Sequence, residues 1–300
     1  MKDILTLFGA SITAQKDGYA KRLSDKFVDS ETHVFGYGGN HLDDAGICFL
    51  DTIVKTNCNY CFLDFFATAY TSISDRTIEC LDTIVHTLTK SNCKLVFLFM
   101  VREDHAKRID FYNFLKRYIT SKHLYSIDLN DSITYTPELF RDTCHTTPLG
   151  SETYANHIYD VFQKEKVNIS YPCDIVKTKY CDGIHVLQVH NTFHKKVVLE
   201  GNCFIVAMYL QIGPKSGIVE IGTKKYWIWD RHCHYTRSQF GLRNIEVRGE
   251  VTLYISQETI DYSTCARPVL DTNVQKELNI LQIYYIGDSL QITSSDHPTG

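Results

Sequence analysis

The chain has 300 residues, of which 31 are basic and 35 acidic, so its formal net charge is −4 with histidine neutral. A balanced charge of this kind creates no strong positive field, and we therefore expect neither nucleic-acid binding nor electrostatic attachment to a membrane. The hydrophobic share of 44% and the charged share of 22% are those of an ordinary globular protein and exclude disorder, collagen and coiled coil. At about 150 residues per domain, two domains are expected.

The cysteines and the N-terminal residues indicate the cellular compartment in which the protein is expected. Most of the eleven cysteines lie in apolar runs, where a reduced thiol packs as a small hydrophobic group. The short apolar stretch after Met1 ends at Gly9 with no secretory cleavage site, and no apolar run approaches the length of a membrane span. We therefore expect a cytoplasmic protein with reduced thiols.

The first half of the chain alternates short apolar runs with amphipathic segments. The strands are almost continuously apolar, as Leu95–Val101 illustrates, which is typical of parallel strands buried on both faces. An α/β domain over residues 1–168, with helices covering a parallel sheet, is therefore expected. Its expected strands are residues 4–8, 33–37, 60–66, 94–101 and 125–129, and its expected helices are residues 19–27, 43–55, 75–90, 104–121 and 151–164.

After about residue 170 the helical pattern almost disappears. Turn residues such as Gly213-Pro214 and Gly222-Thr223 separate β-branched and aromatic runs. Such spacing predicts an antiparallel sandwich or barrel, and we place an all-β, sandwich-like accessory or binding domain over residues 172–300. The expected strands are residues 183–190, 196–212, 217–228, 244–256 and 280–293.

Chemistry is expected just after the strands, because open parallel sheets bind ligands beyond the carboxyl ends of their strands. Ser11 follows the first strand and precedes the first helix, where free N–H groups favour negative charge. Asp142 and His145 form an Asp-x-x-His segment before the last helix of the domain. An imidazole can take a serine proton, and a carboxylate can hold that imidazole in the required tautomer. Alone, each feature also fits a structural role, a helix cap or a solvated turn.

In combination, these segments resemble the SGNH (GDSL-like) hydrolase family. Gly9-Ala10-Ser11 matches the Gly-Asp-Ser block of that family, with alanine in place of the aspartate, and Asp142 with His145 matches its last block. The resemblance covers residues 1–165. It implies a flavodoxin-like, doubly wound sheet and a catalytic triad of Ser11, Asp142 and His145.

The same resemblance implies an oxyanion hole. The segment Gly36-Tyr37-Gly38-Gly39-Asn40 is similar to the glycine block of the family, so the backbone N–H groups of Ser11 and Gly39 are expected to hold the oxyanion. Asn40 is a candidate substrate contact. Where the family carries an oxyanion asparagine, this chain has Thr68, whose hydroxyl can donate one hydrogen bond. Loss of one such donor costs about 10²–10³-fold in rate, so we expect a rebuilt hole or a slow enzyme.

In the second half, both tryptophans of the chain lie in one run. Alternation along a strand would put Trp227 and Trp229 on the same face, where paired rings can stack on a sugar. We take both as candidate substrate-binding residues, with burial in the core as the alternative.

Other patterns raise the alternative of a metal- or redox-dependent protein. Cys58 and Cys61 have CxxC spacing, but no second pair accompanies them, which favours buried structural thiols. Cys144 adjoins His145, and His232-Cys233-His234 resembles a metal pair without further ligands. No phosphate-binding GxxxxGK[ST] loop is present. We expect no metal and no cofactor.

These interpretations lead to a serine esterase that acts through an acyl-enzyme on O-acyl esters of a carbohydrate, most often O-acetyl esters in the family. The first alternative is an O-acyltransferase that uses the same triad with a sugar hydroxyl as acceptor. The second, favoured by the missing asparagine, is a non-catalytic carbohydrate-binding protein on a decayed hydrolase fold. The expected partner is a small-molecule or saccharide ester, and the oligomeric state is left open.

Overall fold

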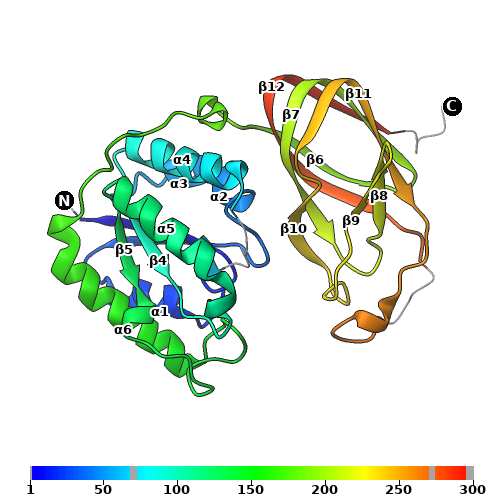
Figure 1. Ribbon diagram of the computed structural model, residues 1–300. Helices are drawn as coiled ribbons and strands as arrows, with labels where there is room; N and C mark the ends of the chain where they lie inside the picture. Colours follow the sequence, from blue (N-terminus) through cyan, green and yellow to red (C-terminus); the bar gives the residue numbers. More distant parts are fainter. Residues whose placement is uncertain (1, 68–72, 270–273, 295–300) are drawn as a thin grey trace. The chain divides into compact units, whose positions relative to one another are not determined.

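The computed structural model describes residues 2–67, 73–269 and 274–294. It divides into two compact units, Met1–Asp182 and Gly183–Gly300, each of which is described by itself (Figure 1). The division falls later than the boundary expected near residues 168–172.

The segment between the expected and the observed boundary packs on the first unit. Ile169 is buried in the core of that unit. Further along, the Tyr180 hydroxyl accepts a hydrogen bond from Arg76 Nη1 at 2.8 Å. These contacts follow the last long helix and carry no periodic pattern, which is why the sequence alone placed the boundary too early.

The first unit is built on a five-stranded parallel sheet in the order β2-β1-β3-β4-β5. Its strands are β1 (Ile4–Gly9), β2 (Glu31–Gly36), β3 (Tyr60–Leu63), β4 (Lys94–Phe99) and β5 (Tyr125–Asp128). The strand order reverses at β1, which lies between β2 and β3. The carboxyl end of β1 is therefore the position at which open α/β sheets bind ligands.

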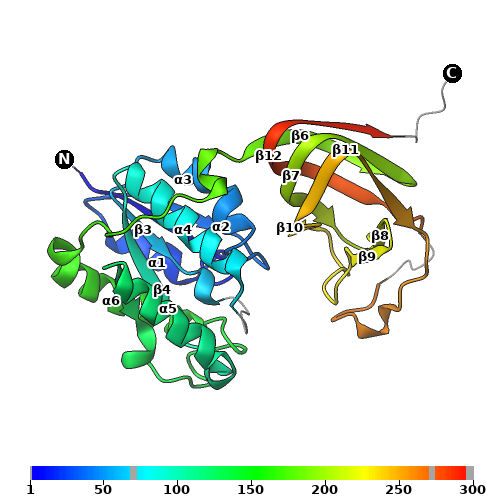
Figure 2. The same ribbon diagram turned by 45° about the horizontal axis from the view of Figure 1, so that its top comes forward.

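Helices cover both faces of this sheet (Figure 1; Figure 2). On one face, α1 and α6 share a core with the strands, which includes Leu23, Tyr154 and Phe162. On the other face, Phe66 stacks on Phe97 of β4 and its ring also meets that of Phe111 in α5. The helices are α1 (Tyr19–Lys26), α2 (Ala45–Cys48), α3 (Leu50–Val54), α4 (Asp75–Lys90), α5 (Ile109–Ser121) and α6 (Pro148–Glu165).

The second unit is a seven-stranded antiparallel sheet in the order β6-β12-β7-β11-β8-β9, with β10 also paired to β7. One edge of β7 pairs with β12, and its other edge pairs first with β11 and then with β10. The inner side chains, such as Leu199 and Leu253, form a separate core. Its strands are β6 (His185–Phe193), β7 (Lys196–Ile212), β8 (Ile218–Ile221), β9 (Lys224–Trp227), β10 (Arg237–Gly241), β11 (Ile245–Ser256) and β12 (Leu278–Ser294).

The expected architecture, a doubly wound parallel α/β sheet followed by an all-β unit, is confirmed. Two details of the β unit differ. The run expected as one strand over residues 217–228 is a hairpin of β8 and β9, turned at Gly222 with φ +58°. The short strand β10 was not expected. Within the described ranges, no helix is both long and apolar enough to cross a bilayer.

Candidate active site

Three side chains from two distant segments meet beyond the carboxyl end of β1. Ser11 lies in the loop after this strand, and its Oγ is 2.9 Å from Nε2 of His145. On the other side of the ring, Nδ1 of His145 is 2.8 Å from Oδ2 and 3.0 Å from Oδ1 of Asp142. This arrangement allows the imidazole to accept the serine proton while the carboxylate holds its other nitrogen.

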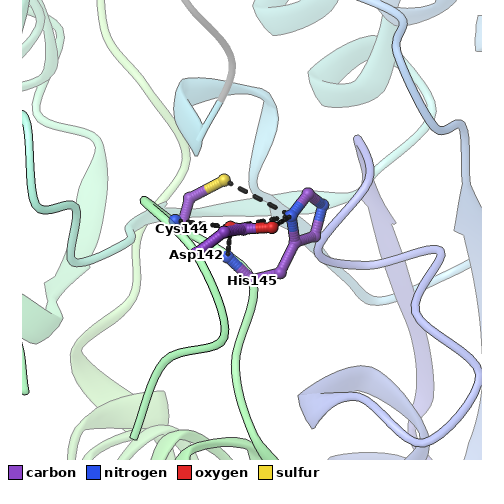
Figure 3. Close-up of side chains that lie close together, drawn as sticks. All are labelled: Asp142, Cys144 and His145. Atoms are coloured by element: carbon purple, nitrogen blue, oxygen red, sulfur yellow. Dashed lines mark hydrogen bonds and ion pairs between the residues drawn. The ribbon is translucent and has the colours of Figure 1, made fainter. Parts of the chain in front are cut away.

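The loop that carries Asp142 and His145 is shaped by its own backbone. Oδ1 of Asp142 accepts hydrogen bonds from the backbone N–H groups of Cys144 at 3.0 Å and His145 at 2.8 Å (Figure 3). An isolated antiparallel bridge between Phe140 and Thr146 closes the loop. The backbone of the loop therefore holds the Asp142 carboxylate in place independently of its contact with the imidazole.

The surroundings favour the charged forms of both partners. Burial raises the pKa of Asp142, but the backbone N–H groups and the imidazole of His145 outweigh it and hold the pKa below its usual value. The Cys144 sulfur, 3.8 Å from Nδ1, has the largest effect on the pKa of His145 and raises it. Against the opposing effect of burial, Cys144 and Asp142 together raise the pKa of His145 to about 9.

A buried carboxylate beneath the serine loop was missing from the expected site. Asp64, directly after β3, is fully buried. Its Oδ1 accepts a hydrogen bond from the backbone N–H of Ala10 at 2.7 Å, and its Oδ2 accepts from the hydroxyls of Thr13 and, at 3.2 Å, Tyr19. Asp64 thus connects the end of β3 to the residues on both sides of Ser11.

Two further observations show how closely Asp64 fits. A Cβ on Gly9 would lie 1.5 Å from Oδ1 of Asp64, so only glycine leaves room for the carboxylate. Burial raises the pKa of Asp64 to about 6, although the hydrogen bonds from Thr13, Ala10 and Tyr19 lower it. One feature of the sequence could have indicated a structural role for Asp64: it is a single acidic residue at the end of a buried apolar strand. A carboxylate in such a position needs hydrogen-bond donors around it.

The glycine block lies directly against the serine loop. A Cβ on Gly36 would lie 2.2 Å from the backbone nitrogen of Ala14, so the two loops approach as closely as glycine allows. Gly39 has φ +73°, a left-handed conformation that favours glycine. Neither Ser11 nor Gly39 donates its backbone N–H to another described group, which leaves both donors available to a ligand.

The two remaining candidates from this region have different outcomes. Asn40 is almost completely buried, and its Nδ2 donates to the carbonyl oxygen of Gly38 at 3.1 Å. This contact braces the glycine turn, and the assignment of Asn40 as a substrate contact stays a prediction. Thr68 lies outside the described residues.

The tryptophan pair expected in the second unit is not formed. Trp227 ends β9 and its side chain is 64% exposed. Trp229 lies beyond the strand, packs against the core of the unit and meets the Tyr262 ring edge-on at 5.8 Å between centroids. The alternation that would have aligned the two indoles stops because the strand ends at Trp227.

The other cysteine and histidine patterns do not form a metal site. Cys58 has its Sγ 3.2 Å from that of Cys93, and both side chains are buried. All eleven cysteines lie in the described part of the chain and are free thiols. Over the described ranges, the one group of three or more His, Cys, Asp or Glu side chains close enough to share a metal ion is Asp142, Cys144 and His145.

Comparison with known proteins adds a likeness of fold. No family model and no curated protein matches this sequence. A two-domain esterase active on acetylated mannans, solved alone and with mannopentaose, superposes with a TM-score of 0.65 at 11% identity, over 99% of this chain and 92% of its own. A putative lipolytic protein of the G-D-S-L family from Desulfitobacterium hafniense DCB-2 covers 53% of this chain and 99% of its own, with a TM-score of 0.48 and 10% identity. The likeness to the two-domain esterase confirms the expected fold, an α/β domain followed by a β domain.

Proposed function

We propose that this protein is a serine esterase that removes O-acyl groups, O-acetyl in particular, from a carbohydrate. The observation that carries the proposal is the continuous chain from Ser11 Oγ to His145 Nε2 at 2.9 Å and from His145 Nδ1 to Asp142 Oδ2 at 2.8 Å. The carbohydrate ester is suggested by the shared fold of the two-domain esterase active on acetylated mannans.

In the proposed acylation step, the base is the neutral form of the His145 ring: Ser11 Oγ attacks the carbonyl carbon of the ester while Nε2 takes the hydroxyl proton. Asp142 stabilises the imidazolium that forms and keeps its Nδ1–H directed away from the serine. As the tetrahedral intermediate collapses, the bond to the sugar oxygen breaks, and His145 gives its proton to that oxygen. The acyl group remains on Ser11.

The negative charge of the tetrahedral intermediate needs donors that are already in place. The backbone N–H groups of Ser11 and Gly39 lack acceptors among the described residues, which supports their assignment as two donors of the oxyanion hole. We assign the third position to the Thr68 hydroxyl. Each donor of this kind contributes about 3–4 kcal/mol to the stability of the transition state.

In the second step, water attacks the acyl-enzyme, and His145 first takes a proton from this water and then returns it to Ser11. The carboxylic acid leaves, and the free enzyme is restored. If a sugar hydroxyl takes the place of water, the same groups transfer the acyl chain to it.

The test uses three readouts on the full chain: acetate release from acetylated mannan, acetyl transfer to an added sugar acceptor, and labelling by a serine-directed fluorophosphonate. We expect Ser11→Ala to abolish all three. The matched control is Ser91→Ala, at the opposite edge of the sheet, where the hydroxyl only donates to the Thr87 carbonyl at 3.0 Å.

Each outcome has a distinct meaning. Activity that persists in folded Ser11→Ala protein would exclude the mechanism. A folded wild type that neither labels nor releases acetate would favour the decayed, carbohydrate-binding form. Transfer to a sugar that exceeds acetate release would replace esterase by acyltransferase.

A further inference from the structure

The loop that carries the acid and the base holds a third reactive group that the proposed mechanism does not use. The Cys144 side chain is 8% exposed, and its Sγ lies 3.8 Å from Nδ1 of His145. This sulfur, Nδ1 and a carboxylate oxygen of Asp142 all lie within 4.8 Å of one another. Figure 3 shows the sulfur and the carboxylate directed toward the same ring nitrogen.

We propose that Asp142, Cys144 and His145 form a binding site for a divalent transition-metal ion, with Zn²⁺ as the best match, and that the bound ion switches the esterase off. The inhibitory role rests on the proposed function, whereas the metal site itself does not. Thiolate, imidazole and carboxylate are the ligand types that Zn²⁺ takes in proteins, and three protein ligands leave its fourth position to water.

The distances require only a small adjustment. With Zn–S near 2.3 Å and Zn–N near 2.0–2.1 Å, a tetrahedral ion holds sulfur and nitrogen about 3.6 Å apart. The observed separation of Sγ and Nδ1 is 3.8 Å. The separation of Nδ1 and Oδ2, 2.8 Å, must widen by about half an ångström to admit the ion. The Asp142 side chain is 53% exposed and can rotate to allow this.

Metal binding rearranges the protons of the triad. Nδ1 has one lone pair, so it cannot bind the ion and keep its hydrogen. Starting from the neutral ring, the Nδ1 proton moves to Nε2 and the thiol proton of Cys144 leaves to solvent, so one proton is released in total. Starting from the charged ring, Nε2 already carries a proton, so the Nδ1 proton and the thiol proton both leave to solvent and two protons are released. Nε2 then donates a hydrogen bond to Ser11 Oγ and can no longer accept the serine proton. The nucleophile has lost its base.

The first experiment measures binding without reference to activity. Metal-free full-length protein is titrated with Zn²⁺ alone by calorimetry and with Co²⁺ alone by absorption, where a cobalt–thiolate bond gives a charge-transfer band. We expect one ion per chain and such a band in the wild type. Both should disappear in Cys144→Ser, which keeps Ser11, Asp142 and His145. The control Cys265→Ser changes a half-buried thiol of the second unit and should bind the ions as the wild type does.

The second experiment measures inhibition. At saturating Zn²⁺, we expect fluorophosphonate labelling of the wild type to slow by about 10²–10⁴-fold, the usual contribution of a general base. Labelling of Cys144→Ser should keep its metal-free rate. Ser11→Ala retains all three ligands, so it should bind metal like the wild type although it cannot be labelled.

The two proposals fail separately. If the wild type hydrolyses esters but binds no Zn²⁺, or if Cys144→Ser binds and is inhibited like the wild type, the metal site is wrong. If the wild type and Ser11→Ala bind one ion through Cys144 and the wild type has no esterase activity, the metal site stands and the proposed function is wrong.

Discussion

Asp64 illustrates how one buried charge can position a reactive loop. Its carboxylate receives the backbone N–H of Ala10 at 2.7 Å, next to the proposed nucleophile, and the hydroxyl of Thr13 two residues beyond it. A buried donor that loses its acceptor costs about 1–3 kcal/mol. Removal of the carboxylate should therefore both destabilise the unit and release the loop.

We expect Asp64→Ala to lower the free energy of unfolding by about 2–4 kcal/mol, because several donors lose their acceptor and a cavity remains. Its kcat should fall more than its KM rises, since Asp64 is a positioning residue that acts through the serine loop. Asp64→Asn keeps an acceptor for Ala10 and should recover part of both losses. Denaturant unfolding and steady-state kinetics on the three proteins provide the check. An Asp64→Ala protein with wild-type kcat would show that the carboxylate has only a structural role.

Asp64 also predicts a pH dependence of stability. Burial raises its pKa from 3.8 to about 6, so between these values the folded state binds a proton that the unfolded state lacks. This contribution to stability is complete below about pH 4 and is lost as pH rises through 6, with a slope of about 1.4 kcal/mol per pH unit. Tyr19, the titratable side chain that faces Asp64, stays protonated here because burial raises its pKa well above the usual value.

Urea unfolding between pH 4 and 7 measures this effect. Asp64→Asn cannot titrate at this position, so the difference in stability between wild type and variant should change steadily across the window. A difference that stays constant with pH would show that Asp64 is ionised throughout.

Helix α6 connects the candidate site to the core, since it begins two residues after the loop of His145 closes. Its first turn is capped by Thr147, whose Oγ1 accepts from the Gly150 N–H at 3.1 Å and donates to the Glu138 carbonyl at 2.7 Å. We expect Thr147→Ala to lower the free energy of unfolding by about 1 kcal/mol and Thr147→Ser to have little effect. Thermal unfolding of the two variants tests this, and equal losses would show that the methyl group, not the hydroxyl, stabilises the helix start.

The elements that the sequence predicted correctly are those whose signals lie within the element itself. The helix over residues 75–90 was predicted from its amphipathic pattern with its observed bounds, and in the structure Ser74 and Thr77 form a capping box at its start. The helix expected over residues 43–55 is broken between α2 and α3 at Phe49, whose ring stacks on Tyr37 at 4.2 Å between centroids. That contact joins two loops and leaves no trace in periodicity.

The candidate site also contains residues that the sequence could predict and residues that it could not. Ser11 and His145 could be paired because their motifs follow in a known order, and the parallel sheet brings both to one edge. The role of Asp64 could not be predicted, because its partners include a backbone N–H and hydroxyls from another segment. The prediction that Trp229 shares a strand face with Trp227 was wrong, because local alternation does not reveal where a strand ends.

The whole chain combines two units that each have a core. The fold is shared with a two-domain esterase of 11% sequence identity, which shows that the architecture depends on burial pattern and strand order and tolerates almost complete replacement of side chains. In this chain, the segment that joins the units is part of the first. Thr178 Oγ1 lies 2.7 Å from the hydroxyl of Thr83 in α4, and Tyr180 accepts a hydrogen bond from Arg76.

This division predicts where the chain can be cut. A chain ending at Asp182 keeps Ile169 and Tyr180, both buried, whereas a chain ending at Asn168 loses them. Because burying one such side chain contributes about 1.5–3 kcal/mol, we expect the shorter chain to be less stable by at least about 2 kcal/mol.

The longer chain should unfold cooperatively in urea and label with a fluorophosphonate at Ser11, since every described contact of the candidate site lies within its own unit. Equal stability of the two chains would contradict the assignment of residues 169–182 to the first unit. A stable longer chain that does not label, beside a full chain that does, would show that the β unit completes the site.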